Sequence, residues 1–230
     1  MAGLAYGALG RLRRVGLRNL ALAFPEKADR ERERILREEY RNLGYLLAEF
    51  CLMRGFTFER SHPSAPEAYA AVPLFAKGRS RRWGYTIGGR WNGRTFTAFE
   101  YRFTRGGNSR HTESFSVMQW DGDDVALPRF WCTPEGFWDR LAQRFGRQDF
   151  DFPEDPAFSD AYQLQGDDEA AVRGSFTAEV RRHLLANPRQ HVAGAGHALF
   201  WWRPGRLPKP DDLDALLAEG DGVRRVFLER

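Results

Sequence analysis

Two hydrophobic periodicities divide the chain. From about Asp29 to Met53, apolar residues recur at steps of three and four, which is typical of one face of a helix. This stripe consists of Leu36, Tyr40, Leu43, Leu47 and Phe50. From about residue 85 onward, apolar and polar residues alternate with period two, as on strands with one buried side. The pattern therefore predicts a helical N-terminal part followed by a part built on a sheet.

The period-two part opens with a predicted hairpin. Asn92-Gly93 is the strongest short signal for a two-residue turn, and within the strand expected after it, over 96–103, residues 99–103 alternate aromatic and charged side chains. Two more strands are expected over 114–120 and 125–132, as antiparallel neighbours joined by a short polar turn. Pro128 predicts that the last of these strands is an edge strand or contains a bulge.

Helical patterns follow these strands. Thr133-Pro134-Glu135 has the capping hydroxyl, the proline and the acid of a helix start. Asp167 or Asp168 is expected to cap one helix whose apolar residues recur every four positions as far as Leu184. A last helix is expected over 212–217, after Pro210.

A closing hairpin is predicted between those helices, around Gly194 and Gly196. Its second strand contains Trp201-Trp202, so one indole is expected to face inward and the other outward. Strands first and helices later favour the α+β class: an antiparallel sheet with helices packed on one face, preceded by an N-terminal helical arm.

The predicted organisation has three parts. Residues 1–27 form a basic amphipathic arm, residues 28–54 an amphipathic helix, and residues 55–230 an α+β domain. The net charge of +4 belongs to the arm alone, because the remaining chain contains as many acidic as basic residues. A neutral body argues against nucleic acid as a partner, since binding to its backbone needs clustered cations.

The arm suggests a second kind of partner. Arg11, Arg14 and Arg18 form one stripe of a helical wheel, with Arg13 beside them and apolar residues opposite. Such a helix can lie on an anionic membrane surface, where each cation contributes about 1 kcal/mol. Two alternatives stay open: the apolar side packs on the protein body, or the end is disordered.

A second cationic cluster occurs in the body, at Arg79, Arg81 and Arg82 beside Trp83. Basic and aromatic residues together can bind an anion, and the alternative is a solvated surface. The sequence therefore leaves an unknown protein or small-molecule partner open.

Other chemistry is poorly represented. Cys51 and Cys132 are the two cysteines and form no Cys-x-x-Cys pair, which favours a reducing compartment. The histidines lack metal-ligand spacing, and neither a P-loop nor a Gly-x-Ser-x-Gly elbow occurs, so no metal and no cofactor are expected. With no apolar run long enough to cross a bilayer, the expected location is cytoplasmic or peripheral at the inner face of the cell membrane.

Several short motifs near the start occur in a recognisable order. They are Arg18-Asn19-Leu20, Ala23-Phe24-Pro25-Glu26, Arg41-Asn42-Leu43-Gly44 and Glu49. With these motifs, residues 11–49 resemble the N-terminal segment of the late acyltransferases of lipid A biosynthesis, the lauroyl and myristoyl transferases. In that family the segment precedes the catalytic part and helps to hold the enzyme at the inner membrane.

The resemblance also implies a catalytic His-x4-Asp/Glu motif, in which a carboxylate orients an imidazole that deprotonates the acceptor hydroxyl. One instance occurs here, His62 with Glu67. It lies only 13 residues after Glu49 and contains Pro63 and Pro66, which favours an irregular surface loop. The later motifs of those enzymes are absent.

The remainder, residues 55–230, resembles an uncharacterised bacterial family of unknown function. The shared features include Gly55-Phe56-Thr57-Phe58, Phe99-Glu100-Tyr101-Arg102-Phe103, Leu127-Pro128-Arg129-Phe130 and Phe158-Ser159-Asp160-Ala161-Tyr162-Gln163-Leu164. That family implies no known reaction.

The leading hypothesis is therefore a non-enzymatic binding domain at the membrane surface. The alternative is a lipid acyltransferase that uses His62 as base and Glu67 as its orienting group. A third reading is that the arm is a recombination or assembly remnant joined to an unrelated domain.

Overall fold

The structure is a computed structural model that describes residues 10–59, 69–70, 72–76, 78–104, 111–137, 149–208 and 210–229. The chain divides into two compact units, Met1–Gly55 and Phe56–Arg230. The first contains α2 (Gly10–Ala23) and α3 (Asp29–Met53). The second contains, in chain order, β1 (Thr57–Glu59), α4 (Pro73–Ala76), β2 (Arg79–Trp91), β3 (Arg94–Thr104), β4 (Thr112–Asp121), β5 (Leu127–Pro134), α5 (Pro156–Ala161), β6 (Tyr162–Gly166), α6 (Glu169–Ser175), α7 (Ala178–Ala186), β7 (His191–Gly196), β8 (Ala198–Pro204) and α8 (Pro210–Leu228).

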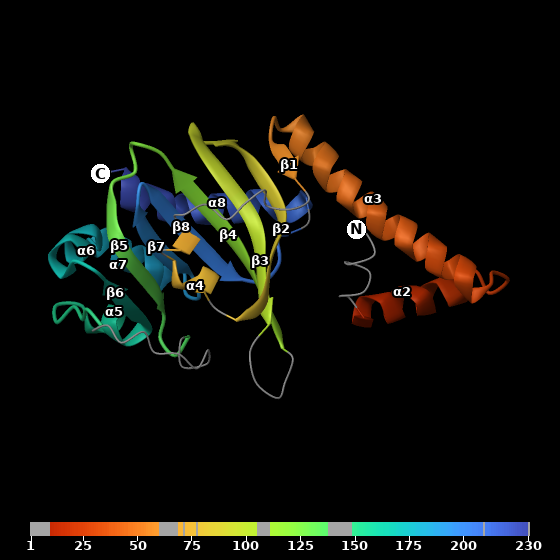
Figure 1. Ribbon diagram of the computed structural model, residues 1–230, viewed down its shortest axis with the longest axis horizontal. Coiled ribbons are helices and arrows are strands. Elements are labelled where there is room, and N and C mark those ends of the chain that lie inside the picture. The colour runs from red at the N-terminus through yellow and green to blue at the C-terminus, as the bar shows by residue number, and fades with distance from the viewer. Residues whose placement is uncertain are drawn as a thin grey trace. The chain divides into compact units, whose positions relative to one another are not determined.

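The first unit is a pair of helices packed on each other (Figure 1). The bounds of α3 confirm the helix predicted over Asp29–Met53. A Cβ added to Gly16 of α2 would lie 2.7 Å from Cδ1 of Leu36 on α3, so the helices approach closely at this glycine. The apolar side of α2 therefore packs on α3 at this glycine.

Arg32 closes the turn between the two helices. Its guanidinium donates from Nε to the Phe24 carbonyl at 3.2 Å and from Nη2 to the Pro25 carbonyl at 3.0 Å. A helix end leaves its last carbonyls without partners inside the helix, and cationic side chains often satisfy them. The Phe24-Pro25 motif is thus held by a side chain from the start of α3.

The second unit is built on an eight-stranded antiparallel sheet, in the order β1-β2-β3-β4-β8-β7-β5-β6. The predicted hairpin is confirmed: β2 and β3 are joined at Asn92 and Gly93, with φ of 48° and 80°. Positive φ at both central residues is the requirement of the tight turn that Asn-Gly favours. The α+β prediction is confirmed as well.

One predicted neighbour relation is wrong. The strands β4 and β5 are not adjacent, because β8 and β7 lie between them. The link that follows β4 crosses the end of the β7–β8 hairpin, and the Gly122 N–H donates to the His197 carbonyl at 3.1 Å. The expected bulge near Pro128 is confirmed by a register shift between Leu127 and Phe130 where β5 pairs with β7.

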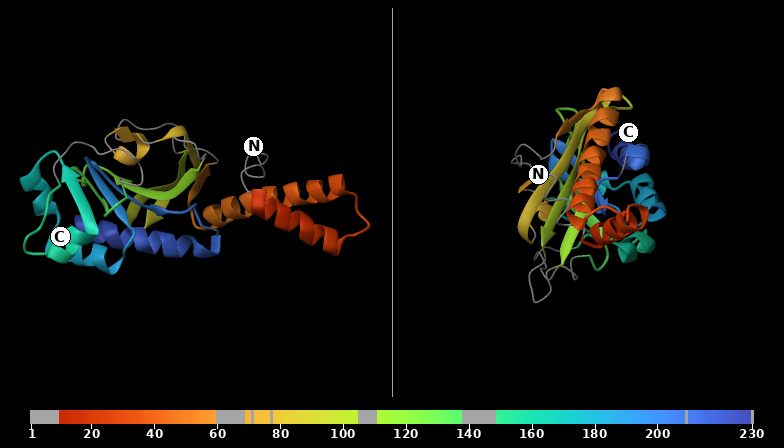
Figure 2. Two further views of the ribbon diagram at one scale, coloured as in Figure 1. Left: turned by 90° about the horizontal axis from the view of Figure 1, so that it is seen from below. Right: turned by 90° about the vertical axis from the view of Figure 1, so that its right-hand side faces the viewer.

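Both faces of the sheet are covered, as the left-hand view of Figure 2 shows. On one face α4 contributes to an aromatic core that includes Phe75, Phe99, Phe200 and Trp202. On the other face α8 approaches so closely that a Cβ at Gly220 would lie 2.5 Å from the sulfur of Met118. The expectation of one exposed indole is therefore wrong, because Trp201 and Trp202 are both fully buried.

Two helix predictions also need correction. Thr133 and Pro134 do not start a helix but belong to β5, where they pair with β6, so the strand ladder prevails over the capping pattern. The helix expected from Asp168 to Leu184 is two helices. It breaks at Phe176, whose ring is buried against Phe130, and Thr177 caps the second helix. No helix in the described ranges is long and apolar enough to cross a membrane.

Candidate functional site

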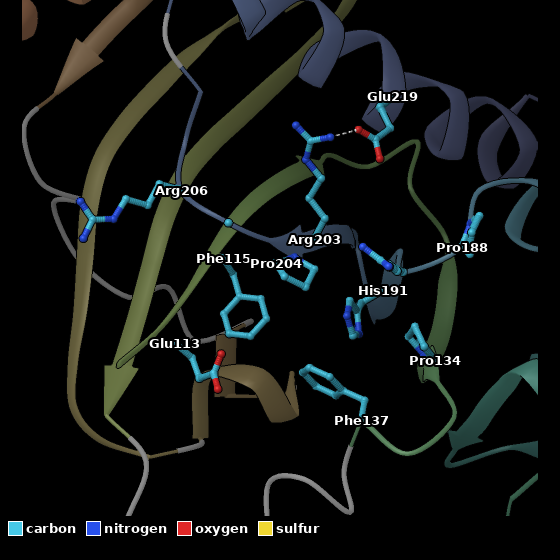
Figure 3. A pocket seen from close by; sticks show the side chains of 12 residues that line it. Glu113, Phe115, Pro134, Phe137, Pro188, His191, Arg203, Pro204, Arg206 and Glu219 are labelled. Atoms are coloured by element: carbon cyan, nitrogen blue, oxygen red, sulfur yellow. Dashed lines mark hydrogen bonds and ion pairs between the residues drawn. The ribbon is translucent and has the colours of Figure 1, made fainter. Parts of the chain in front are cut away.

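A cavity of about 880 Å³ lies at one end of the central strands, where β5 and β8 finish and where β4 and β7 begin (Figure 3). Its lining residues are Glu113, Phe115, Pro134, Phe137, Pro188, Arg189, His191, Arg203, Pro204, Gly205, Arg206 and Glu219. This volume falls within the range of small-molecule sites in proteins, about 300–1,000 Å³. The cavity is therefore the candidate site of the second unit.

Aromatic rings form one side of this cavity. The Phe137 ring centroid lies 4.2 Å from that of His191, and His191 stacks on Trp202 at 5.3 Å and 10°. Phe115 on β4 meets Phe137 edge to face at 6.1 Å. Figure 3 shows the rings of Phe115, Phe137 and His191 grouped together. Because Trp202 is fully buried in the core, its contact with His191 restricts the position of the imidazole ring.

A hydrogen-bonded pair forms the opposite side. Arg203, at the end of β8, forms an ion pair with Glu219 of α8, and Glu219 also accepts a hydrogen bond from Gln190 Nε2 at 3.2 Å. Gln190 is buried, immediately before β7. The guanidinium of Arg203 is thus held in place by the helix that covers the sheet. An arginine fixed in this way presents its remaining N–H groups without further loss of side-chain entropy.

Arg206 extends away from the ring group (Figure 3). Its Nε lies 4.0 Å from Oε1 of Glu100, a buried carboxylate on β3. Arg102 Nε is also 2.9 Å from Glu100 Oε1, at ion-pair distance but not aligned as a hydrogen bond. Burial raises the pKa of Glu100, while Arg102, Arg206 and the Leu207 N–H oppose the rise. The link after β8 is thus held against β3 by a carboxylate.

Arg189 is an exposed cation of the cavity lining. It has a φ of 72°, a left-handed conformation that is uncommon for a residue other than glycine. Within the described part of the chain, no carboxylate lies within ion-pair distance of its guanidinium. The acids of the lining are engaged elsewhere: Glu219 pairs with Arg203, and Glu113 lies 3.7 Å from His111. The cavity lining therefore has uncompensated positive charge.

The structure places part of the predicted membrane-binding set. Arg14 and Arg18 lie on α2 and are exposed. Arg11 and Arg13 also belong to α2, but their side chains lie outside the described residues. In the described ranges, the exposed large hydrophobic side chains all belong to the first unit: Val15, Leu22, Phe24, Leu52 and Met53.

The predicted anion patch lies at the start of β2. Arg79, Arg81 and Arg82 are all exposed there. Arg81 has a structural contact as well, because its Nη1 donates to the Phe75 carbonyl of α4 at 2.9 Å. The patch stays a prediction, and none of its three arginines lines the 880 Å³ cavity.

His62 and Glu67, the residues of the acyltransferase alternative, lie outside the described residues. The two cysteines are buried and free, and burial raises the pKa of each thiol, most strongly for Cys132. A buried thiol with a raised pKa is a poor nucleophile. The described ranges contain no cluster of three or more His, Cys, Asp or Glu that could hold a metal ion.

Comparisons with known proteins give one family match and one similar solved structure. The family model for bacterial lipid A biosynthesis acyltransferases matches residues 2–60. The resemblance of the N-terminal segment to that family is thereby confirmed, over about a quarter of the chain. No curated protein matches the chain.

The fold of the chain is similar to that of one solved structure, the mycobacterial trehalose monomycolate transport factor A, TtfA. The similarity has a TM-score of 0.53 at 12% sequence identity and covers 82% of this chain and 94% of TtfA. At that identity it establishes a shared α+β architecture. No reaction follows from it.

Sequence reasoning did not find the cavity. Its lining residues range from Glu113 to Glu219, and Pro134 alone among them belongs to a motif discussed above, a capping pattern that does not point to a cavity. His191 and Trp202 belong to the closing hairpin, on strands β7 and β8. Their pairing across β7 and β8, which stacks the two rings, was already implied by that hairpin and is the one signal in the sequence that points to this end of the sheet.

Proposed function

We propose that this chain is a non-enzymatic binding protein and that its helical unit holds it at an anionic membrane surface. The observation that carries the proposal is the composition of the exposed side of α2. Val15 and Leu22 are 49% and 75% exposed, and Arg18 lies between them at helical spacing. Arg14 lies one turn before Arg18.

This surface suits a lipid interface better than water. Arginine side chains reach phosphate head groups while their stems and neighbouring apolar residues enter the boundary layer. Phe24, 40% exposed at the end of α2, extends the apolar part. The family match over residues 2–60 supports the same location, because its named family acts in the biosynthesis of lipid A. TtfA, which shares the fold, is named for transport of trehalose monomycolate.

The test is sedimentation of the full chain with phosphatidylcholine vesicles, with and without phosphatidylglycerol. We expect binding only to the anionic vesicles. The double substitution Arg14→Ala/Arg18→Ala removes two cations from the proposed surface and should weaken binding by about 2 kcal/mol, or about thirtyfold in Kd. Leu22→Ser/Phe24→Ser should weaken it through the apolar contribution.

The matched control is Arg30→Ala/Arg34→Ala. Both arginines are exposed on α3, so this variant removes the same charge from the same unit. It should retain most of the binding. Equal losses in the two double variants, or vesicle binding that persists after removal of residues 1–27, would reject the proposal.

The second candidate function is lipid acyl transfer with His62 as base and Glu67 as its orienting group. The family match favours it for the N-terminal segment, but the matched range ends at residue 60, before both residues. If this function holds, the protein transfers acyl groups to a lipid acceptor and His62→Ala abolishes the transfer. A wild-type protein with no transfer activity would leave membrane-surface binding as the better account.

A further inference from the structure

The cavity of the second unit has two chemically different sides. The rings of Phe115, Phe137 and His191 form an apolar side, and Pro134, Pro188 and Pro204 also line the cavity. Arg189, Arg203 and Arg206 supply the cations. A purely polar metabolite would leave the rings solvated, and a neutral hydrocarbon would leave the arginines without a function. The lining favours a ligand that is apolar at one end and anionic at the other.

The charge balance decides the sign of the ligand. Two carboxylates line the cavity, but Glu219 is already bound by Arg203 and Gln190, while Glu113 lies beside His111. Arg189 has no carboxylate partner among the described residues, and Arg206 has only the distant contact with Glu100. A cationic ligand would have to displace these pairs. An anionic ligand adds a partner to Arg189 and a closer one to Arg206.

The lining is also preorganised. His191 is fixed between Phe137 and Trp202, and Arg203 is fixed by α8 through Glu219. A ligand that meets groups already held in position loses less affinity to side-chain ordering. Apart from Phe137, which follows β5, these contacts come from residues of β7, β8 and α8.

We propose that this cavity binds an amphipathic organic anion, with a ring or apolar chain against Phe115 and Phe137 and a carboxylate, phosphate or sulfate facing Arg189 and Arg206. The inference concerns the second unit and is independent of the membrane-binding role of α2. The same chemistry occurs in a lipid head group with its glycerol backbone and in a soluble metabolite. A competition experiment therefore decides which of the two is the ligand.

The probe is anilinonaphthalene sulfonate (ANS), an aromatic anion whose fluorescence rises on leaving water. Titration of the full-length protein should show one saturable site. Phe137→Ala should weaken binding through loss of ring contact, and Arg189→Ala/Arg206→Ala should weaken it by about tenfold or more, as expected for charge-assisted hydrogen bonds. Arg203 is left intact because its substitution would remove the ion-pair partner of Glu219.

The matched control is Arg182→Ala, an exposed arginine on α7 that does not line the cavity. It should leave the ANS titration unchanged. Because ANS also reports exposed apolar surface, Leu22→Ser/Phe24→Ser serves as a second control. An ANS signal that disappears in that variant and survives in the cavity variants would overturn the proposal. Circular dichroism of each variant confirms folding.

Competition then separates the two sources. Displacement of ANS by dihexanoyl-phosphatidylglycerol alone assigns a lipid head group, and displacement by glycerol phosphate alone assigns a soluble anion. If neither compound displaces ANS, the proposed anion site is contradicted. The cavity variants should also keep their vesicle binding while Arg14→Ala/Arg18→Ala keeps its ANS titration, so that failure of one proposal is distinguishable from failure of the other.

Discussion

The helical unit and the sheet unit use apolar residues in opposite ways. In the sheet unit, large rings such as Phe99, Phe200 and Trp202 are completely buried between the sheet and the segments that cover it. In the helical unit, Leu22 and Met53 are 75% and 88% exposed. Buried apolar area stabilises a fold, whereas a cluster of exposed apolar residues marks a surface that meets something else.

This difference separates the unit that forms a buried core from the unit whose apolar residues are partly exposed. The sheet unit forms a core from residues far apart in the chain, so it specifies a shape with a cavity. The helical unit is held by the close contact at Gly16 and by the hydrogen bonds of Arg32 in the turn. Some of its apolar side chains, such as Leu22 and Met53, are exposed to solvent. The contrast makes quantitative predictions, which follow from the largest effect to the smallest.

The largest expected effect is Phe200→Ala in the sheet unit. Phe200 is fully buried, and its ring centroid lies 5.4 Å from that of Tyr69 and 5.9 Å from that of Phe75. Deleting such a ring loses its transfer free energy and leaves a cavity, at a cost of about 3–5 kcal/mol in the free energy of unfolding. Urea denaturation followed by tryptophan fluorescence measures the loss.

The control for that prediction is Leu22→Ala in the helical unit. Exposed substitutions usually change the free energy of unfolding by less than about 0.5 kcal/mol. If Leu22→Ala destabilised the protein as much as Phe200→Ala, the exposed side of α2 would be part of a core, and the contrast between the units would fail.

A smaller effect is expected at the cavity end of the sheet unit, where Glu100 is buried. Burial raises the pKa of Glu100 above its ordinary value of 4.5, against the opposing influence of Arg102 and Arg206. A carboxyl with a raised folded-state pKa holds its proton more tightly in the folded state. Its ionisation therefore lowers stability as pH rises from 4.5 through the raised pKa, and has no effect below 4.5.

Glu100→Gln removes that ionisation. We expect the variant to be more stable than the wild type near neutral pH and equally stable in acid, where Glu100 is protonated. Denaturant midpoints measured across this pH range test the prediction. A variant that is less stable than the wild type near neutral pH, with the difference vanishing in acid, would mean that the ion pairs with Arg102 and Arg206 outweigh the cost of burial.

The same contrast explains what the sequence could predict. The α3 helix and the Asn92-Gly93 hairpin depend on residues that are near one another in the chain, and both were predicted correctly. The neighbour of β4 depends on residues 198–204, about eighty positions later, and local turn chemistry pointed to β5 instead. Local signals identify elements, but the order of strands is decided by which distant surfaces bury best.

The cavity was unpredictable for a related reason. Arg203 and Glu219 lie on different elements, and Phe137 meets His191 only because β5 and β7 are adjacent. Each of these residues is unremarkable in its local sequence. The exposed side of α2 was predictable in part. The helical wheel predicted the arginine stripe, but the apolar side opposite that stripe packs on α3. The apolar residues exposed beside the arginines are Val15 and Leu22.

The smallest expected effect is Arg32→Ala, which tests how the helical unit is held. The substitution removes the hydrogen bonds to the Phe24 and Pro25 carbonyls and should cost about 1 kcal/mol locally. Opening of α2 should then rise about fivefold, seen as faster hydrogen exchange of its amides, while the sheet unit exchanges as before. Arg30→Ala, an exposed neighbour on α3, is the control and should leave exchange unchanged. Equal acceleration in both variants would show that the turn is held by helix charge in general. In that case Arg32 would have no specific role, and the helical unit would depend on the Gly16 contact alone.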